Sequence, residues 1–422
     1  MTRATSPLWH PFTQHAVAGE MIGISRAEGA TLETHDGRRI LDAISSWWVI
    51  THGHRQPRIM AAIRQQTEKL DQVIFAGFTH EPAEKLARGL ITHAPTGLAH
   101  VFLSDSGSTA VEVALKMALG YWSNLGQQRT RILALEHGYH GDTVGAMSAG
   151  ARGVFSRAYA PLLFDVERIP FPQPGREQTT LDALEQACRD PRAAALIVEP
   201  LIAGAGGMLT YSIETLAEMS RICRKHGVLL ILDEVMTGWG RTGTLWACTQ
   251  AGVAPDILCT AKGLTGGAIP LAATLATPAI YDAHYSTDRS RTFFHSSSYT
   301  ANPIACAAAV ANLEIWDSEP VAERIATLVA MQSQRLDRFR ADARFANVRQ
   351  CGTITAMDLT VPDDGYLAGI GPTLYRAFLE AGVLLRPLGN TIYVMPPYCV
   401  TAAYLDRVYD AIDGAADRVI PR

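Results

Sequence analysis

The chain contains few lysines, and it lacks the sequence patterns of membrane-spanning, secreted and zinc-binding proteins. Five of its 37 basic side chains are lysines, so lysine was largely avoided. No apolar run reaches the roughly eighteen residues that a membrane span needs, and no charged-then-apolar signal pattern opens the chain. The seven cysteines are scattered and never spaced as Cys-x-x-Cys, which favours neither a disulfide framework nor a zinc site. We expect buried thiols in a cytoplasmic protein.

The net charge argues against nucleic acid as the main partner, and the length favours two domains. A formal net charge of -4 leaves no global basic face. Because 422 residues exceed what one hydrophobic core usually supports, we expect a large domain at 56–310 and a small C-terminal domain at 311–422. The N-terminal segment 1–55 is expected to join the small domain. No internal repeat or low-complexity tract interrupts this plan.

An α/β fold is predicted by alternating helical and β-rich patterns. The expected strands of the large domain are 99–103, 131–135, 194–198 and 228–232. Strands separated by helices predict a mostly parallel sheet covered by helices on both faces. After residue 302 two helical stretches precede strand-like 353–357 and 391–395. These are typical of a small α+β domain.

One lysine and one carboxylate stand at the ends of apolar runs. Lys262 follows the run 255–259, and Asp233 ends the run 228–232, at the strand ends where α/β sheets bind ligands. In isolation, Asp233 is just a polar residue that ends a strand. As a pair, they suit an electron-sink cofactor such as pyridoxal phosphate, which needs a lysine to carry it as a Schiff base and a carboxylate to keep its ring nitrogen protonated. Burial would lower the pKa of Lys262 and leave the amine free to attack an aldehyde.

A small-residue turn, 104–109, joins the strand 99–103 to a helix. Gly107 and Ser108 at that helix start offer backbone N–H groups, which favour a phosphate. The alternative is that the turn is simply a good helix cap. It is neither a Walker loop nor G-x-G-x-x-G.

Other side chains have weaker signals. Tyr139 follows a strand end and suits stacking on a planar cofactor, with a loop tyrosine as the alternative, while the nearby His137 and His140 lack a third metal ligand. Trp47-Trp48 is more often core packing, and on a strand at most one of the two rings would line a cleft. Arg386 suits capture of a carboxylate, although a structural ion pair is the default for a single arginine.

Together these segments resemble the class III aminotransferases, pyridoxal-phosphate enzymes of fold type I, over nearly the whole chain. The motifs that carry the resemblance are 8–13, 45–48, 104–108, 138–143, 238–243, 262–267, 302–307, 386–387 and 393–398. Within that class the Trp-His-Pro opening, the double Trp and the Met-Pro-Pro-Tyr ending are similar to the aminotransferases of biotin biosynthesis. The resemblance implies amino transfer to 8-amino-7-oxononanoate, giving 7,8-diaminononanoate, with S-adenosylmethionine as the donor.

The resemblance also implies roles for the residues. Lys262 would carry pyridoxal phosphate and move the substrate proton, and Asp233 would partner the ring nitrogen. Tyr139 would cover the ring face, while Gly107 and Ser108 would hold the phosphate.

Further roles concern the substrate and a second subunit. Ser298 would complete the phosphate site from the partner in a homodimer, and Glu199 would lie near the cofactor. Arg386 would bind the carboxylates of donor and acceptor in turn, as a ping-pong enzyme requires. The other residues implied for substrate binding are Phe12, Trp47, Trp48 and Tyr393.

Three departures from the family pattern leave the donor open. Phe12 stands where adenosylmethionine-using enzymes usually have Tyr, Ser297-Ser298 replaces Pro-Thr, and Ala203 replaces a common Gln. The same reaction with lysine as donor, or an ω-aminotransferase for a diamine or ω-amino acid, stays open. A nucleotide-dependent oxidoreductase is disfavoured because no G-x-G-x-x-G follows an early strand, and a non-catalytic binding protein would leave Lys262 and Asp233 unexplained.

Overall fold

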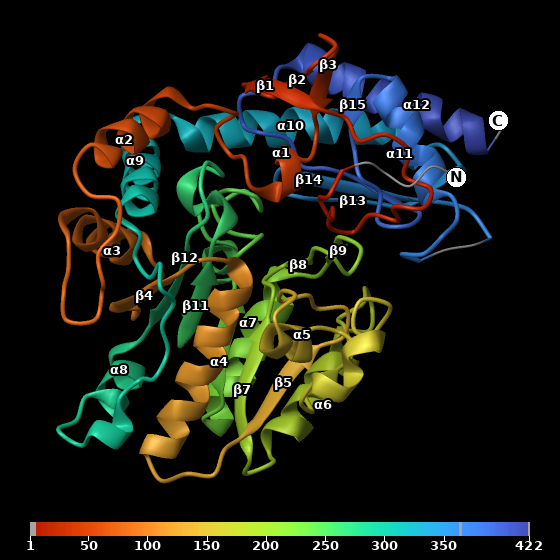
Figure 1. Cartoon of the computed structure of the whole chain (residues 1–422). Coiled ribbons are helices and arrows are strands. Elements are labelled where there is room, and N and C mark those ends of the chain that lie inside the picture. The colour runs from red at the N-terminus through yellow and green to blue at the C-terminus, as the bar shows by residue number, and fades with distance from the viewer. Residues whose placement is uncertain (1–5, 363–364, 421–422) are drawn as a thin grey trace.

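A seven-stranded sheet forms the centre of the molecule (Figure 1). The computed structural model describes residues 6–362 and 365–420. In order across the sheet the strands are β4 (His100–Ser104), β12 (Ala272–Ala276), β11 (Ile257–Thr260), β10 (Leu229–Asp233), β7 (Ala193–Val198), β5 (Arg131–Leu135) and β6 (Glu167–Ile169). β12 is antiparallel to both neighbours, and the other pairs are parallel. The predicted mostly parallel sheet is confirmed.

Both faces of this sheet are buried under helices. Leu133 and Leu135 of β5 pack into one apolar cluster, whereas Ile132 and Ala134 pack into another, because successive side chains of a strand point to opposite faces. The first cluster contains side chains of α3 (Glu81–His93), α6 (Glu177–Cys188) and α7 (Ile213–His226). The second contains side chains of α4 (Gly107–Asn124), α5 (Val144–Ala149) and α8 (Pro278–His284). Burial on both faces explains why these strands are continuous apolar runs.

The two ends of the chain build smaller sheets together. Three N-terminal strands pair in sequence, and the third pairs in parallel with a C-terminal strand through Leu41 and Val383. The four strands are β1 (Ile24–Glu28), β2 (Thr31–Thr34), β3 (Arg39–Asp42) and β15 (Val383–Leu384). An antiparallel sheet contains β13 (Phe345–Cys351), β14 (Ile354–Leu359) and β16 (Thr391–Val394), and a hairpin contains β8 (Ile202–Ala203) and β9 (Leu209–Thr210).

The domain boundaries at 55 and 310 stay a prediction, and residues 1–5 and 421–422 lie outside the described part.

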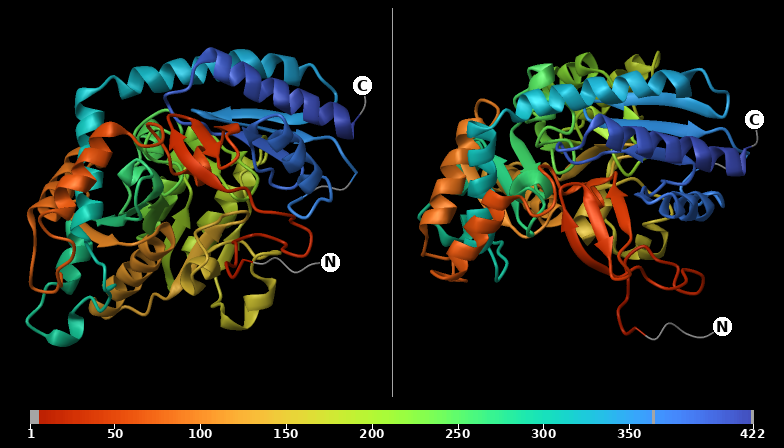
Figure 2. Two further views of the ribbon diagram at one scale, coloured as in Figure 1. Left: turned by 45° about the horizontal axis from the view of Figure 1, so that its top comes forward. Right: turned by 90° about the horizontal axis from the view of Figure 1, so that it is seen from above.

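The described part of the chain has six further helices and four 3-10 turns. They are α1 (Ser45–Trp48), α2 (Pro57–Thr67), α9 (Pro303–Ser318), α10 (Val321–Arg340), α11 (Gly371–Glu380) and α12 (Ala402–Val419). The 3-10 turns are η1 (Arg157–Leu162), η2 (Ala247–Ala251), η3 (Lys262–Thr265) and η4 (Arg289–Arg291). Figures 1 and 2 show α10 and α12 side by side along the small sheets, with the N-terminal strands beside them. Within residues 6–362 and 365–420, no helix is long and apolar enough to cross a membrane.

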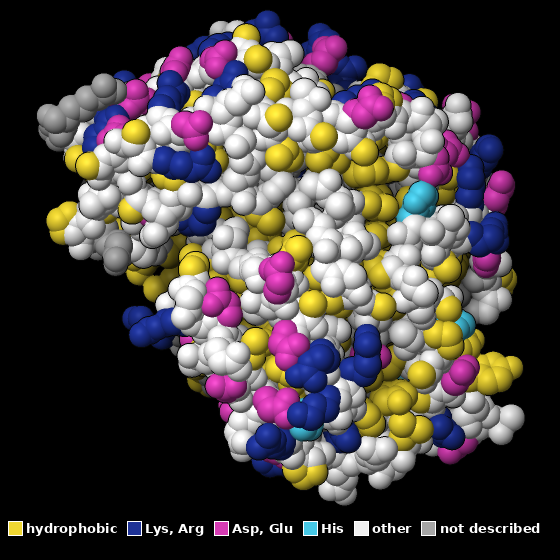
Figure 3. Space-filling view, turned by 180° about the vertical axis from the view of Figure 1, so that it is seen from behind, with side chains coloured by type: hydrophobic (Ala, Val, Ile, Leu, Met, Phe, Trp, Pro, Cys, Tyr) yellow, Lys and Arg dark blue, Asp and Glu magenta, His cyan; other side chains and the backbone are white. Residues whose placement is uncertain are grey.

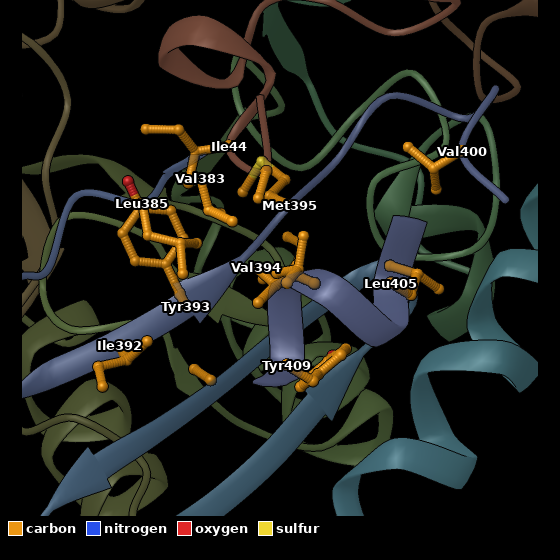
Figure 4. Close-up of a cluster of buried hydrophobic side chains, with 14 of the residues drawn as sticks. Ile44, Val383, Leu385, Ile392, Tyr393, Val394, Met395, Val400, Leu405 and Tyr409 are labelled. Atoms are coloured by element: carbon orange, nitrogen blue, oxygen red, sulfur yellow. The ribbon is translucent and has the colours of Figure 1, made fainter. Parts of the chain in front are cut away.

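A second apolar core holds the C-terminal strands in place. Figure 4 shows Ile392 and Val394 of β16 with Leu405 and Tyr409 of α12. Tyr393 lies between the two strand residues and is itself buried. This packing fixes the strand that carries Tyr393.

One face of the surface carries mixed charges, and two cysteines differ from the prediction of buried thiols. On the face drawn in Figure 3, basic and acidic side chains are interspersed. Five cysteines are buried as expected, but Cys351 is half-buried and Cys399 is exposed. Cys399 follows the Met-Pro-Pro-Tyr segment in a turn before α12, where the chain returns to the surface.

Candidate active site

Five parallel strands end at one edge of the large sheet and deliver polar residues to one place. These residues are Gly107 after β4, Tyr139 and His140 after β5, Glu199 after β7, Asp233 at the end of β10 and Lys262 after β11. All of them line a single cavity of about 580 Å³. Such an edge is where open α/β sheets bind ligands. The structure therefore brings the lysine and the carboxylate singled out in the sequence into one cavity.

Lys262 begins a 3-10 turn in a left-handed backbone conformation, with φ of 46°. That conformation costs a side-chain-bearing residue about 1–2 kcal/mol, so the surroundings must hold it. Its Nζ lies 4.9 Å from the ring centroid of Trp48. Burial lowers the pKa of this amine to about 8, while the charges of Asp233 and Glu199 act in the opposite direction. The neutral form of this amine is therefore far more populated near physiological pH than that of an exposed lysine, although the charged form still predominates.

Asp233 is buried and paired with a histidine. Its Oδ2 lies 2.7 Å from Nδ1 of His140, and its Oδ1 accepts a hydrogen bond from the backbone N–H of Val235 at 3.1 Å. The other ring nitrogen of His140 is buried without a partner in the described part of the chain. Sequence reasoning considered His140 only as a metal ligand and missed this contact. No group of three metal-ligating side chains occurs within the described ranges.

Glu199 is a buried carboxylate that fixes the loops around the cavity. It accepts hydrogen bonds from the backbone N–H of Tyr139 at 2.9 Å and of Gly204 at 3.0 Å. Burial raises its pKa to about 7; His140 opposes the shift and Asp233 reinforces it. Burial likewise raises the pKa of Tyr139, which keeps that phenol protonated. Glu199 therefore anchors the loop that presents Tyr139 to the cavity.

The start of α4 offers an anion site next to these groups. Ser106 caps the helix by accepting from the N–H of Thr109 at 3.2 Å, so the cap alternative holds for this serine. The amides of Gly107 and Ser108 meet no acceptor among the residues described here, and they lie where the helix dipole favours an anion. Gly141 packs so closely on Ser108 that a Cβ there would approach its Oγ to 2.0 Å. The two loops thus form one cradle.

Both tryptophans line the cavity, which corrects the strand reading of their segment. Trp47 and Trp48 lie in a short helical turn, not a strand, with positive φ at Ser45, Ser46 and Trp48. The indole Nε1 of Trp48 donates to the phenol oxygen of Tyr393 at 2.9 Å. The irregular backbone turns both rings to the same side, which a strand would not allow.

Arg386 lies at the mouth of the cavity without a carboxylate partner in the described ranges. Its Nη2 donates to the carbonyl oxygen of Phe12 at 2.8 Å, and its guanidinium lies 5.2 Å from the ring centroid of Trp47. Phe12 has a φ of 48° and meets the rings of Trp47 and Phe155 edge-on at 5.6 and 5.8 Å. Among the residues that the structure describes, no ion pair of the kind expected by default engages the guanidinium, which lines the cavity where an anion could bind.

Two further aromatic residues complete the mouth, and sequence reasoning missed both. Phe155 and Tyr366 line the cavity, with their ring centroids 4.4 Å apart. They come from irregular segments with no motif around them, so no sequence signal distinguishes them.

Ser298 is the one predicted site residue that lies elsewhere. It is exposed and does not line the cavity, and its carbonyl accepts from Gln72 Nε2 at 2.9 Å. Ser297 beside it accepts at its carbonyl from Thr300 Oγ1. Within one chain, neither serine lines the cavity.

The residues present fit pyridoxal phosphate. An amine without a hydrogen-bond partner in the described part of the chain, a buried carboxylate, an aromatic side chain and two free helix amides all line one cavity. This set offers a covalent attachment point, a partner for a ring nitrogen, a stacking surface and an anion site. No other common cofactor needs that combination.

Comparison with known proteins extends this likeness over the full length. A family model described as Aminotransferase class-III matches residues 13–415. A Synechococcus elongatus protein named adenosylmethionine-8-amino-7-oxononanoate aminotransferase is 47% identical over 421 residues, covering 98% of this chain and 99% of the relative.

Solved structures also match this chain over nearly its full length. One, of an adenosylmethionine-8-amino-7-oxononanoate aminotransferase from Methanocaldococcus jannaschii, has a TM-score of 0.93 and 34% identity, covering 98% of this chain and 97% of that one. Another, of an amine transaminase from an uncultivated Pseudomonas species in a PLP-bound form, has a TM-score of 0.92 and 34% identity, covering 99% and 100%.

Proposed function

Because this chain belongs to the class-III aminotransferases, which are pyridoxal-phosphate enzymes, we propose that it transfers an amino group to 8-amino-7-oxononanoate and makes 7,8-diaminononanoate in biotin biosynthesis. One observation carries the proposal: Lys262 and Asp233 line one cavity in a chain that is 47% identical, end to end, to a relative named for this reaction. A shared cofactor site supports amino transfer, and the full-length identity supports the acceptor.

The cofactor would be held by residues from four strand ends. Lys262 would bind it covalently, Asp233 would partner the ring nitrogen, and Tyr139 would cover one ring face. The amides of Gly107 and Ser108 would hold the phosphate, and Glu199 supports the loop of Tyr139. Bound pyridoxal phosphate supplies an electron sink and a carbon that takes up and gives back the amino group.

Lys262 acts as general base and general acid in both half-reactions. Its Nζ removes the proton from the amino-bearing carbon of the donor and later returns one to the acceptor carbon. A pKa of about 8 allows the amine to exist in both protonation states near neutral pH, as a group that takes and returns one proton requires.

Asp233 is held in place by its contacts. Its Oδ1 accepts from the Val235 N–H and its Oδ2 lies 2.7 Å from Nδ1 of His140, so the carboxylate is positioned to partner a ring nitrogen. His140 also fixes the rotation of the carboxylate, so that its direction into the cavity is defined. His140 is therefore a positioning residue for Asp233.

The mouth of the cavity suits an amphiphilic substrate. Arg386 binds the carboxylate of donor and acceptor in turn, which gives a ping-pong order with one pocket used twice. The apolar chain of the acceptor lies against Trp47, Trp48 and Phe12, and Tyr393 holds Trp48 in place. Phe12 offers no hydroxyl to the donor, and the donor assigned is S-adenosylmethionine, as in the names of the relatives.

We also assign the protein to a cytoplasmic homodimer. Ser298 is exposed and lies outside the cavity of its own chain, so its hydroxyl is free to serve a second subunit. In a dimer this hydroxyl reaches the cradle of the partner.

The test uses the full-length protein loaded with pyridoxal phosphate. It is mixed with 8-amino-7-oxononanoate and, in separate reactions, with S-adenosylmethionine, lysine or a diamine, and 7,8-diaminononanoate is measured by mass spectrometry. We expect product with S-adenosylmethionine and none with Lys262→Ala. Product with lysine alone would correct the donor. Amination of simple ketones without any diaminononanoate would replace the proposal with an ω-aminotransferase.

A further inference from the structure

We propose that Asn312 and His52 form a positioning relay that holds Lys262 in its strained, cavity-facing conformation. The inference rests on the proposed role of Lys262 as the amine that binds the cofactor. Neither residue lines the cavity, and neither belongs to the resemblance on which the function rests.

Asn312 joins helix α9 to the turn that carries the lysine. Its side chain is fully buried, and its Nδ2 donates to the carbonyl oxygens of Gly263 and Leu264, each at 3.0 Å. These are the two residues that follow Lys262. Both amide hydrogens of one side chain are thus used on consecutive carbonyls, which fixes the course of the turn directly after the left-handed residue.

His52, which follows Trp47 and Trp48 in the sequence, is the second member of the relay. Its Nε2 lies 2.9 Å from Oδ1 of Asn312. Because the Asn312 amide nitrogen already faces two carbonyls, the oxygen must accept, so His52 carries its proton on Nε2. Burial lowers the pKa of His52 to about 4, which keeps the ring neutral at neutral pH, and the contact with Asn312 sets its tautomer. The titratable groups near it include Glu319 and the cations Arg324 and Arg241.

The same turn also packs against a tryptophan. A Cβ on Gly263 would lie 2.6 Å from Cβ of Trp239, so the turn packs directly on that side chain. Trp239 is itself fixed through its Nε1, which donates to Thr260 Oγ1 at 2.8 Å. Trp239 and Asn312 thus both restrain the turn, and the left-handed backbone of Lys262 persists because of these restraints.

The decisive variant is Asn312→Asp, which keeps the shape of the side chain and removes both donors. The full-length protein is freed of cofactor, pyridoxal phosphate is added, and the adduct on Lys262 is trapped with borohydride at short times and quantified on its peptide. The rate is measured from pH 6.5 to 10. We expect Asn312→Asp to slow capture by about tenfold and to move the midpoint of the pH profile.

Two matched variants separate positioning from stability. Gln332 is a fully buried amide in the C-terminal core that also donates to a backbone carbonyl, Thr353 O at 2.7 Å, but it lies outside the cavity lining. Gln332→Glu should lower thermal stability as Asn312→Asp does and leave capture unchanged. His52→Leu should slow capture, and His52→Gln, which keeps a donor, should restore it. These His52 variants decide the matter if Asn312→Asp does not fold.

The proposal is overturned if Asn312→Asp captures the cofactor at the wild-type rate and midpoint, or if Gln332→Glu slows capture equally. Failure of the wild-type protein to capture pyridoxal phosphate at all would overturn the proposed function, so the two failures are distinguishable.

Discussion

The sharpest prediction concerns the ionisation of Lys262 in the protein without cofactor. Burial lowers the pKa of this amine from 10.5 to about 8. The shift corresponds to about 3 kcal/mol of destabilisation of the charged form. At pH 7.5 roughly a quarter of the amine is then neutral, against roughly one part in a thousand for an unperturbed lysine.

Pulse labelling measures this directly. The full-length cofactor-free protein receives short pulses of a small amine-selective reagent between pH 6.5 and 11, and the Lys262 peptide is quantified with the exposed Lys69 as internal reference. We expect a midpoint near 8 for Lys262. Because the charge of Asp233 raises the pKa, Asp233→Asn should move this midpoint lower still. A midpoint at 10 or above in the wild-type protein, or an upward shift in the variant, would refute the reasoning.

Three further changes test other parts of the site. Asp233→Asn should lower kcat by orders of magnitude with cofactor still bound, because a neutral amide does not hold the ring nitrogen protonated; near-normal turnover would contradict this role. Arg386→Ala should raise KM for carboxylate-bearing substrates by at least about tenfold, since a charge-assisted contact is lost, and an unchanged KM would remove Arg386 from the site. His52 has a pKa of about 4 in the fold against 6.5 when exposed, so the unfolded chain binds the extra proton between these values. From pH 6.5 down to 4 the wild-type protein should therefore lose up to about 3 kcal/mol of unfolding free energy relative to His52→Gln, as followed by urea unfolding. Parallel pH profiles of the two proteins would exclude a buried neutral His52.

The strand framework could be predicted because it depends on local patterns. The run 131–135 coincides with β5, and the run before Asp233 coincides with β10 to within one residue. Each strand is buried on both faces, so the apolar signal is continuous. Since parallel strands share an edge, the position of Asp233 and Lys262 at neighbouring strand ends follows from the same pattern.

The conformation of the tryptophan segment could not be predicted, because distant contacts decide it. Buried Asp42 accepts from the backbone N–H of Ser46 at 2.8 Å, and Ser45 Oγ donates to the carbonyl of Met395, 350 positions away in the sequence. These contacts stabilise left-handed residues that a local reading assigns to a strand. The pairing of His140 with Asp233 depends in the same way on the order of strands, because β7 lies between β5 and β10. The mouth residues Phe155 and Tyr366 lie in irregular segments, where no periodicity exists to read.

The link between β3 and β15 has a consequence for how the protein is made. On the ribosome, the first strands emerge early, yet Leu41 must wait for Val383, and Ser45 must wait for Met395. At about 5–20 residues per second, translation of the 350 intervening positions takes roughly 20–70 s. During that interval the nascent N-terminus has no partner for its open strand edge, which is the kind of surface that chaperones cover.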